Sequence, residues 1–196
     1  MDKYLKASKF INYDHPSVQS KASELARGLH SDVDIAKNCF EFVRDEIKHS
    51  MDFKLNPVTC IASDVLKFGT GYCYAKSHLL AALLRYNNIP TGLCYQRLTI
   101  TDKPPFCIHG LNTIYLKKYG WYRVDARGNK LGVDAYFEPP LEKLAFPIIT
   151  VGEADIAGIW SDPMPEVVNV LTRFNRYDEV AANLPDIIFD QPPTEY

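Results

Sequence analysis

Long apolar runs are absent from this sequence. Nowhere do about 18 apolar residues follow one another, which is roughly the length that a membrane-spanning helix requires. The first ten residues, Met1 to Phe10, contain neither an uninterrupted apolar run nor a small-residue cleavage site. We therefore expect a soluble, cytoplasmic protein that does not use a membrane as a partner.

The sequence also lacks an excess of charge of either sign. It has 22 basic and 24 acidic residues, for a net charge of −2, so its composition gives no reason to expect binding to nucleic acid. Of its 196 residues, 46% are hydrophobic and 23% are charged, which is typical of a globular domain. Because no repeat or change of composition divides the chain, we interpret residues 1–196 as a single domain.

Paired cysteines are missing as well. The chain has an odd number of cysteines and no CxxC pair: Cys39, Cys60, Cys73, Cys94 and Cys107. This pattern argues against a disulfide framework. Cys107 and His109 form the one close pair of zinc-type ligands, whereas structural zinc sites use two such pairs, and the clustered acidic loops of calcium sites are absent. We expect no metal and no cofactor.

Hydrophobic periodicity predicts helices in the first half of the chain and strands after it. The expected helices cover residues 17–29, 31–47, 62–66, 73–85 and 166–174, and the expected strands cover residues 91–100, 108–116 and 121–124. Helices followed by a run of antiparallel strands indicate an α+β fold. We expect a core over about residues 31–130. Residues 131–196 would then be an irregular, proline-containing covering segment with a C-terminal helix and an extended or disordered tip.

A glycine-containing turn leads directly into the most apolar of these helices, and Cys73 stands at the helix start. Gly69 and Gly71 permit the tight turn that precedes it. The free N–H groups and the positive end of the helix dipole favour the thiolate form of a cysteine in this place. Cys73 is therefore a candidate nucleophile, although buried cysteines are common in protein cores. Whether Cys73 can act as a nucleophile depends on whether the chain supplies a base.

His109 is the best-placed candidate for that base. His78, on the same helix as Cys73, lies about 140° around the helix axis and faces away from the sulfur. His109 stands near the start of a strand, and Asp125 ends the next strand. Simple hairpin pairing places Asp125 opposite roughly residues 112–114, so a contact with His109 needs a bulge or a diagonal arrangement.

Three motifs in this order resemble the transglutaminase-like superfamily. They are the Gly-x-Gly-x-Cys turn at the start of an apolar helix that ends in Asn-Ile-Pro, a strand that begins with a histidine, and a Gly-Trp-x-x-Val-Asp segment: residues 69–90, 109 and 120–125. The similarity covers about residues 35–130. It implies the papain-like cysteine protease fold, in which N-terminal helices and a central cysteine-bearing helix pack on an antiparallel β-sheet.

The resemblance also implies roles for individual residues. Cys73 corresponds to the nucleophile, His109 to the base and Asp125 to the group that orients His109. The backbone N–H of Cys73 is one expected donor to the oxyanion, and Tyr72 and His49 are candidates for the second. The family commonly has a larger residue after the catalytic histidine, whereas this chain has Gly110, which leaves the wall of the substrate pocket undefined.

The hypothesis that follows is a cysteine-dependent hydrolase that cleaves peptide or amide bonds through a thioester intermediate. Its substrates would be proteins, peptides or small amides. Acyl transfer to an amine uses the same residues as far as the thioester, and a catalytically inactive binding module of the same fold is a third possibility. Arylamine acetyl transfer is a weaker alternative, because the residues that flank the cysteine in that family are absent here. The natural substrate and the oligomeric state stay open.

Overall fold

The computed structural model describes residues 1–187. Residues 188–196, which include the tip expected to be extended or disordered, lie outside the described residues. Within residues 1–187, no helix combines the length and the apolar character needed to cross a membrane.

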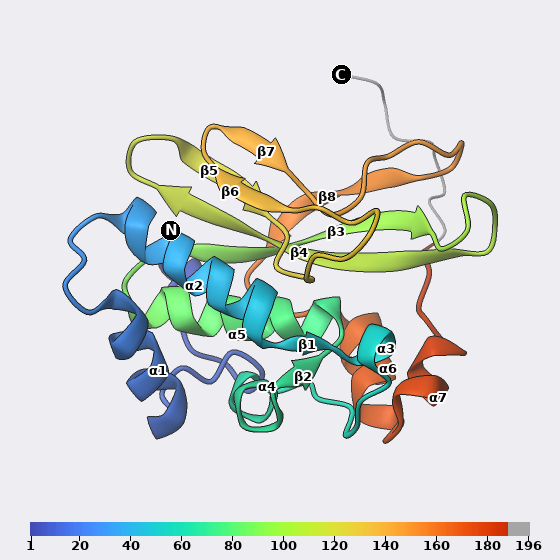
Figure 1. The fold of residues 1–196 in the computed structure, drawn as a ribbon, viewed down its shortest axis with the longest axis horizontal. Coiled ribbons are helices and arrows are strands. Elements are labelled where there is room, and N and C mark those ends of the chain that lie inside the picture. The colour runs from blue at the N-terminus through green and yellow to red at the C-terminus, as the bar shows by residue number, and fades with distance from the viewer. Residues whose placement is uncertain (188–196) are drawn as a thin grey trace.

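Helices and strands form two layers (Figure 1). The helices are α1 (Pro16–Ala26), α2 (Asp32–Glu46), α3 (Ser50–Phe53), α4 (Ala62–Phe68), α5 (Cys73–Tyr86), α6 (Pro165–Arg173) and α7 (Tyr177–Ala181), and a 3-10 turn (Asp2–Tyr4) precedes them. The strands are β1 (Lys48–His49), β2 (Thr70–Gly71), β3 (Thr91–Thr99), β4 (Phe106–Leu116), β5 (Gly120–Val124), β6 (Tyr136–Glu138), β7 (Leu141–Lys143) and β8 (Ala154–Trp160). This architecture confirms the predicted α+β fold class.

Helix α5 is the centre of the molecule. Every residue from Cys73 to Arg85 is buried, and the leucine- and alanine-rich segment from Leu79 to Leu84 combines strong helix propensity with apolar side chains. The helix packs on β3 and β4 and also contacts α1, α2 and α4. Figure 1 shows it beneath the sheet, with α2 running alongside. The predicted central position of the cysteine-bearing helix is therefore confirmed.

The main sheet is antiparallel, with strand order β5-β4-β3-β8. β3 and β4 pair without interruption from Thr91 opposite Ile114 to Thr99 opposite Phe106. β4 and β5 form the hairpin expected from the sequence, with Val124 opposite Asn112. The three predicted strands thus correspond to β3, β4 and β5 in order and approximate extent.

The segment after Asp125 differs from the expectation. Instead of being irregular, it forms the β6–β7 hairpin and strand β8, and β8 adds to the main sheet beside β3. Its sequence, Ala-Asp-Ile-Ala-Gly-Ile-Trp, contains an acid and a glycine, and the pairing with β3 shifts register between Leu93 and Tyr95. The expected loop at residues 49–59 likewise contains α3. Such short elements depend on tertiary pairing more than on local propensity.

Candidate active site

Cys73 is the first residue of α5, and the backbone before it is held from two sides. β1 and β2 pair in parallel, with His49 opposite Gly71. A Cβ atom on Gly71 would lie 3.1 Å from Cβ of Ala75 and 3.2 Å from Oγ1 of Thr59, so a side chain there would fit only if these neighbours shifted. Gly69 ends α4 with φ of 64°, the left-handed region that glycine favours. Both glycines singled out in the sequence thus fix the approach to Cys73.

His109 and Asp125 form a buried pair. Nε2 of His109 lies 2.7 Å from Oδ2 of Asp125, and Asp125 also accepts hydrogen bonds from the backbone N–H groups of Arg127 at 3.1 Å and Ala145 at 3.2 Å. Burial raises the pKa of Asp125, but His109 and these hydrogen bonds outweigh it, so the pKa is lowered overall and the group is a carboxylate.

The contact is diagonal across the hairpin. Val124 pairs with Asn112, so Asp125 follows the strand next to Leu111, two residues from His109. Pairing between β4 and β5 is regular from Leu116 to Asn112. Of the two arrangements expected from the sequence, the hairpin uses the diagonal contact and needs no bulge between these strands.

His109 and Cys73 line the same cavity. Burial by itself lowers the pKa of His109, but the charges of Asp125 and Cys73, together with hydrogen bonds to both, raise it to about 10. The backbone N–H of Gly110 also donates to Sγ of Cys73 at 3.5 Å. At neutral pH the ring is therefore an imidazolium between a carboxylate and the sulfur, the arrangement of a thiol nucleophile with its acid–base partner.

Tyr74 occupies the space that a side chain at position 110 would need. A Cβ atom on Gly110 would lie 2.9 Å from Cδ1 of Tyr74 and 3.2 Å from its Cα. The hydroxyl of Tyr74 donates a hydrogen bond to the carbonyl of Ile108. Gly110 therefore lets the start of α5 approach β4 closely, and Tyr74 supplies the wall that the sequence left undefined.

His49 lies at the edge of the same cavity as Cys73. Its ring packs edge-to-face on Tyr72, with centroids 5.4 Å apart. Burial, followed by the positive charge of Arg127, lowers the pKa of His49 well below its ordinary value, so the ring is neutral. Its Nδ1 is buried and has no hydrogen-bond partner among the residues described, and the nearest carboxylate oxygen, Oδ2 of Asp52, is 3.7 Å away.

Tyr72 is placed differently from His49. Its hydroxyl donates a 2.5 Å hydrogen bond to the carbonyl of Tyr177 in α7, and burial raises its pKa. The phenol proton is thus directed at α7. Of the two side chains predicted as oxyanion donors, His49 keeps a free ring nitrogen and Tyr72 does not keep its hydroxyl free.

A cavity of about 290 Å³ opens beside Cys73 and His109. Its apolar lining includes Met51, Leu98, Val133, Phe146 and Leu184. Phe146 packs edge-to-face on His109, with centroids 5.1 Å apart, so the segment after Asp125 covers one side of the cleft, as the sequence suggested it could.

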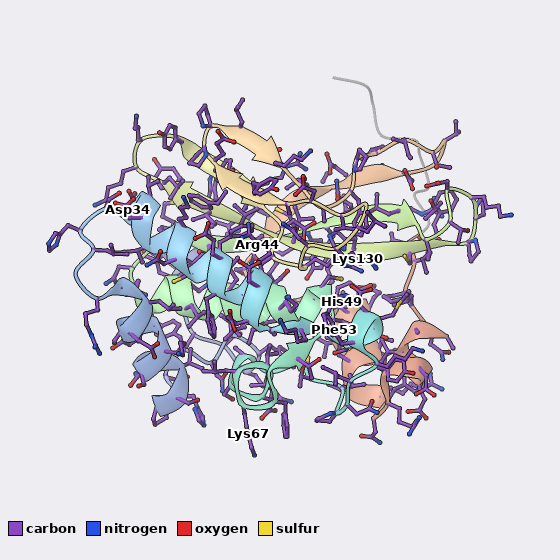
Figure 2. The ribbon with its side chains drawn as sticks, in the orientation of Figure 1. Asp34, Arg44, His49, Phe53, Lys67 and Lys130 are labelled. Carbon is purple, nitrogen blue, oxygen red and sulfur yellow. The ribbon has the colours of Figure 1, made fainter. Side chains whose placement is uncertain are left out.

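Two cationic residues at this cavity were missed in the sequence. Arg127 and Lys130 line it, and both bind Asp52, at 2.7 Å and 2.6 Å respectively. Arg127 lies two residues after Asp125, and this closeness to a candidate catalytic residue could have identified it from the sequence. Nothing local connects Asp52 to either cation. Figure 2 shows Lys130 close to His49 and Phe53.

All five cysteines are free thiols. Cys107 also lines the cavity, but burial, followed by the charge of Cys73, raises its pKa to about 12, so it stays protonated at neutral pH. In the part of the chain that the structure covers, residues 1–187, no three His, Cys, Asp or Glu side chains are grouped as metal ligands.

Fold and site together define a class of protein in which a cysteine at a helix start faces a histidine–aspartate pair on an antiparallel sheet. Residues 19–126 match the transglutaminase-like superfamily, and the chain belongs to this superfamily. The match begins earlier than the resemblance seen in the sequence, because it includes most of α1. No match was found among curated proteins.

Solved structures with a similar fold are only distantly related in sequence. A candidate cysteine protease from Cytophaga hutchinsonii aligns with 63% of this chain and 40% of its own, at 19% identity and a TM-score of 0.51. The periplasmic domain of TgpA from Pseudomonas aeruginosa aligns over 63% of this chain and 45% of its own, at 18% identity and a TM-score of 0.47. A candidate protease from Parabacteroides distasonis has 14% identity and a TM-score of 0.45, over 75% of this chain and 30% of its own. The chain thus covers well under two thirds of each of these proteins, and the likeness to the first concerns the fold.

Proposed function

We propose that the protein is a cysteine-dependent hydrolase of peptide or amide bonds, with Cys73 as nucleophile, His109 as acid and base, and Asp125 as the orienting group. The observation that carries this proposal is the buried 2.7 Å contact between His109 and Asp125 at a cavity that Cys73 also lines. A histidine with a purely structural role in a protein core would not need both a buried carboxylate and a thiol as neighbours.

The proposed acylation step starts from the thiolate–imidazolium pair. Sγ of Cys73 attacks the carbonyl carbon of the substrate, and the carbonyl electron pair moves to oxygen. The tetrahedral intermediate collapses as the C–N bond breaks and the imidazolium gives its proton to the leaving amine. Asp125 keeps the ring in the orientation that presents this proton.

Deacylation returns the enzyme to its starting state. His109, now neutral, takes a proton from water while the water oxygen attacks the thioester carbon. The C–S bond then breaks, the carboxylic acid leaves and the thiolate is restored. Both tetrahedral intermediates carry an oxyanion, for which the backbone N–H of Cys73, unpaired at the start of α5, and the ring of His49 are the proposed donors.

The test is a screen of peptide, isopeptide and small-amide substrates with the wild type and with Cys73→Ala. Turnover that disappears in Cys73→Ala supports the proposal. Asp125→Asn should lower kcat/KM by roughly 10² to 10⁴, the range for a misoriented acid–base group. Turnover retained in Cys73→Ala, or none with any substrate class, would contradict the proposal.

Acyl transfer to an amine is separated from hydrolysis in the same assay. Release of the leaving amine is measured with and without an added primary amine, and the acyl product is identified by mass spectrometry. Hydrolysis predicts the free acid under both conditions, whereas transfer predicts the new amide. A binding module predicts neither product.

A further inference from the structure

A second cavity adjoins the catalytic cavity. Its volume is about 330 Å³, and it shares His49, Arg127 and Lys130 with the cavity that Cys73 lines. We call this second cavity the cationic pocket, after the side chains that line it: Arg44, Lys48, Lys76, Arg127 and Lys130. They come from α2, β1, α5 and the loop after β5. Figure 2 labels four of the residues that line this pocket, Arg44, His49, Phe53 and Lys130.

The acidic residues of the cationic pocket do not balance its positive charges. Asp45 is bound by Arg44 through two contacts, at 2.7 Å and 2.8 Å. Asp52 is shared by Arg127 and Lys130. These are the two acids in the lining, and each can neutralise one cation. The chain as a whole carries a net charge of −2, so the positive excess is local.

Within residues 1–187, the remaining ammonium groups bind only backbone carbonyls. Nζ of Lys48 donates to the carbonyl of Asp45 at 2.8 Å, and Nζ of Lys76 donates to those of Arg44 and Ile47. Burial, followed by the positive charge of Arg127, lowers the pKa of Lys76 to about 7, although the charges of Asp125 and Asp45 act in the opposite direction. A carboxylate in this pocket would supply the charge that the lining lacks.

A free polar atom points to a ligand at the same place. His49 separates the two cavities and is 94% buried, since its exposed fraction is 6%. Its Nδ1 has no hydrogen-bond partner in the described part of the chain. Buried polar atoms in folded proteins nearly always have a partner. The closest carboxylate oxygen, Oδ2 of Asp52, is 3.7 Å from this nitrogen, too far for a hydrogen bond, so the nitrogen is available to a bound polar group.

We propose that the cationic pocket binds a carboxylate of the substrate, so that the enzyme prefers amides carrying an acidic side chain or a free terminal carboxylate a few bonds from the reacting carbonyl. This inference rests on the proposed function, because it names the substrate class of the same site. The pocket selects the substrate, and Cys73 and His109 carry out the chemistry.

Affinity labels test this inference without knowledge of the natural substrate. Three chloroacetylated reagents differ only in charge: chloroacetyl-glutamine amide is neutral, chloroacetyl-glutamate amide carries a side-chain carboxylate, and chloroacetyl-glutamine carries a terminal carboxylate. Each alkylates a thiolate with loss of chloride. The rate of labelling at Cys73 is followed by mass spectrometry, with Cys73→Ala as the blank and peptide mapping to exclude Cys107.

At least one carboxylate reagent should label the wild type roughly five to ten times faster than the neutral reagent, the effect of about one charge-assisted contact. Lys48→Gln and Lys130→Gln should each reduce this ratio, and Lys130→Glu should bring it to one or below. Lys67→Gln removes an equal charge from the last turn of α4, outside the pocket, and should keep the ratio. High salt should also reduce it.

The carboxylate reagent whose faster labelling disappears in the lysine variants shows whether the pocket recognises a side-chain or a terminal carboxylate. Because His109 acts on all three reagents alike, differences among the variants report the contribution of the cationic pocket to the labelling rate. Equal labelling rates in the wild type, or a ratio that Lys130→Glu leaves unchanged, would overturn the inference while leaving Cys73 as a nucleophile. Failure of all three reagents to label Cys73 would instead contradict the proposed function, and the inference with it.

Discussion

At the scale of single residues, the strongest constraint on the site is the positive charge of His109. Its pKa is raised to about 10 in the folded chain, whereas a histidine in an unfolded chain titrates near 6.5. Between these two values the folded protein holds a proton that the unfolded chain has released. The ion pair therefore contributes fully below about pH 6.5, and its contribution is lost as the pH rises towards 10.

This difference predicts how stability depends on pH. Measured in the Cys73→Ala background, where no thiolate enters the proton balance, the free energy of unfolding relative to that of the protein that also carries His109→Gln should fall by roughly 1–3 kcal/mol as the pH rises from 6.5 towards 10, because the pair with Asp125 holds the proton. Urea unfolding at several pH values measures this difference, and comparison with the variant removes the titration of other groups such as Lys76. A difference that stays constant over this range would show that His109 is neutral in the folded protein.

The second oxyanion donor can be assigned by a matched pair of substitutions. His49→Ala should lower kcat by roughly 10² to 10³ with a small change in KM, because the donor acts on charge that develops in the transition state. Tyr72→Phe should cost much less, since that hydroxyl is bound to Tyr177.

His49→Gln, which keeps an N–H donor, should recover part of the loss in kcat. Steady-state kinetics on any substrate found in the screen provide the measurement. The reverse order of losses, with Tyr72→Phe the more severe, would assign the role to Tyr72 instead.

Residues with strong local context were the ones that sequence alone could predict. Cys73 follows a glycine turn and begins an apolar helix, and His109 and Asp125 stand at the ends of successive strands. Arg127 and Lys130 were missed because their common partner, Asp52, lies about 75 positions earlier in the chain, and no periodicity links the two segments. Such contacts follow from the fold and not from a motif.

At the scale of elements, the close packing of α5 on β4 depends on Gly110. Its missing side chain leaves room for Tyr74. An alanine there would place Cβ 2.9 Å from Cδ1 of Tyr74, so the helix start or the tyrosine must move. Gly110→Ala should destabilise the protein by roughly 1–3 kcal/mol, as overpacking does, and should also lower activity, because Cys73 and His109 lie on the two elements that are forced apart.

A double-mutant cycle tests this explanation. Tyr74→Leu removes part of the clashing ring, and in its presence the cost of Gly110→Ala should fall by at least about 0.5 kcal/mol, the lower limit of coupling between residues in contact. Chemical denaturation of the four proteins supplies the free energies. Additive costs would mean that Gly110 is needed for another reason.

Strand β8 marks the limit of prediction at this scale. The strands that were predicted, β3 to β5, carry β-branched and aromatic residues and belong to consecutive hairpins. β8 instead reaches the sheet after a long connection, and one of its pairings places Asp155 opposite Gln96, where the two side chains are joined by a 3.0 Å hydrogen bond. Its strand conformation comes from the edge of β3, which local sequence does not reveal.

At the scale of the whole molecule, Arg85 ties together three segments at the end of α5 opposite Cys73. Its guanidinium donates to the carbonyls of Thr91, Lys6 and Ser161, at distances from 2.7 Å to 3.0 Å. These acceptors belong to the N-terminal segment, the start of β3 and the residue that follows β8. Burial lowers the pKa of Arg85 to about 10, so the group remains charged at neutral pH.

Arg85→Met should therefore lower the free energy of unfolding by roughly 2–5 kcal/mol, because it removes the donor to the buried carbonyl of Thr91 and to the partly buried carbonyls of Lys6 and Ser161. Arg176→Met, at a position where the side chain is 60% exposed, is the matched control and should change stability by less than about 0.5 kcal/mol. Since α5 is about 20 Å long, Arg85→Met molecules that remain folded should still be labelled at Cys73 by the neutral chloroacetyl reagent. A lower labelling rate in Arg85→Met protein that stays folded would contradict this expectation. It would mean that the loss of the Arg85 hydrogen bonds alters the position of Cys73 at the other end of α5.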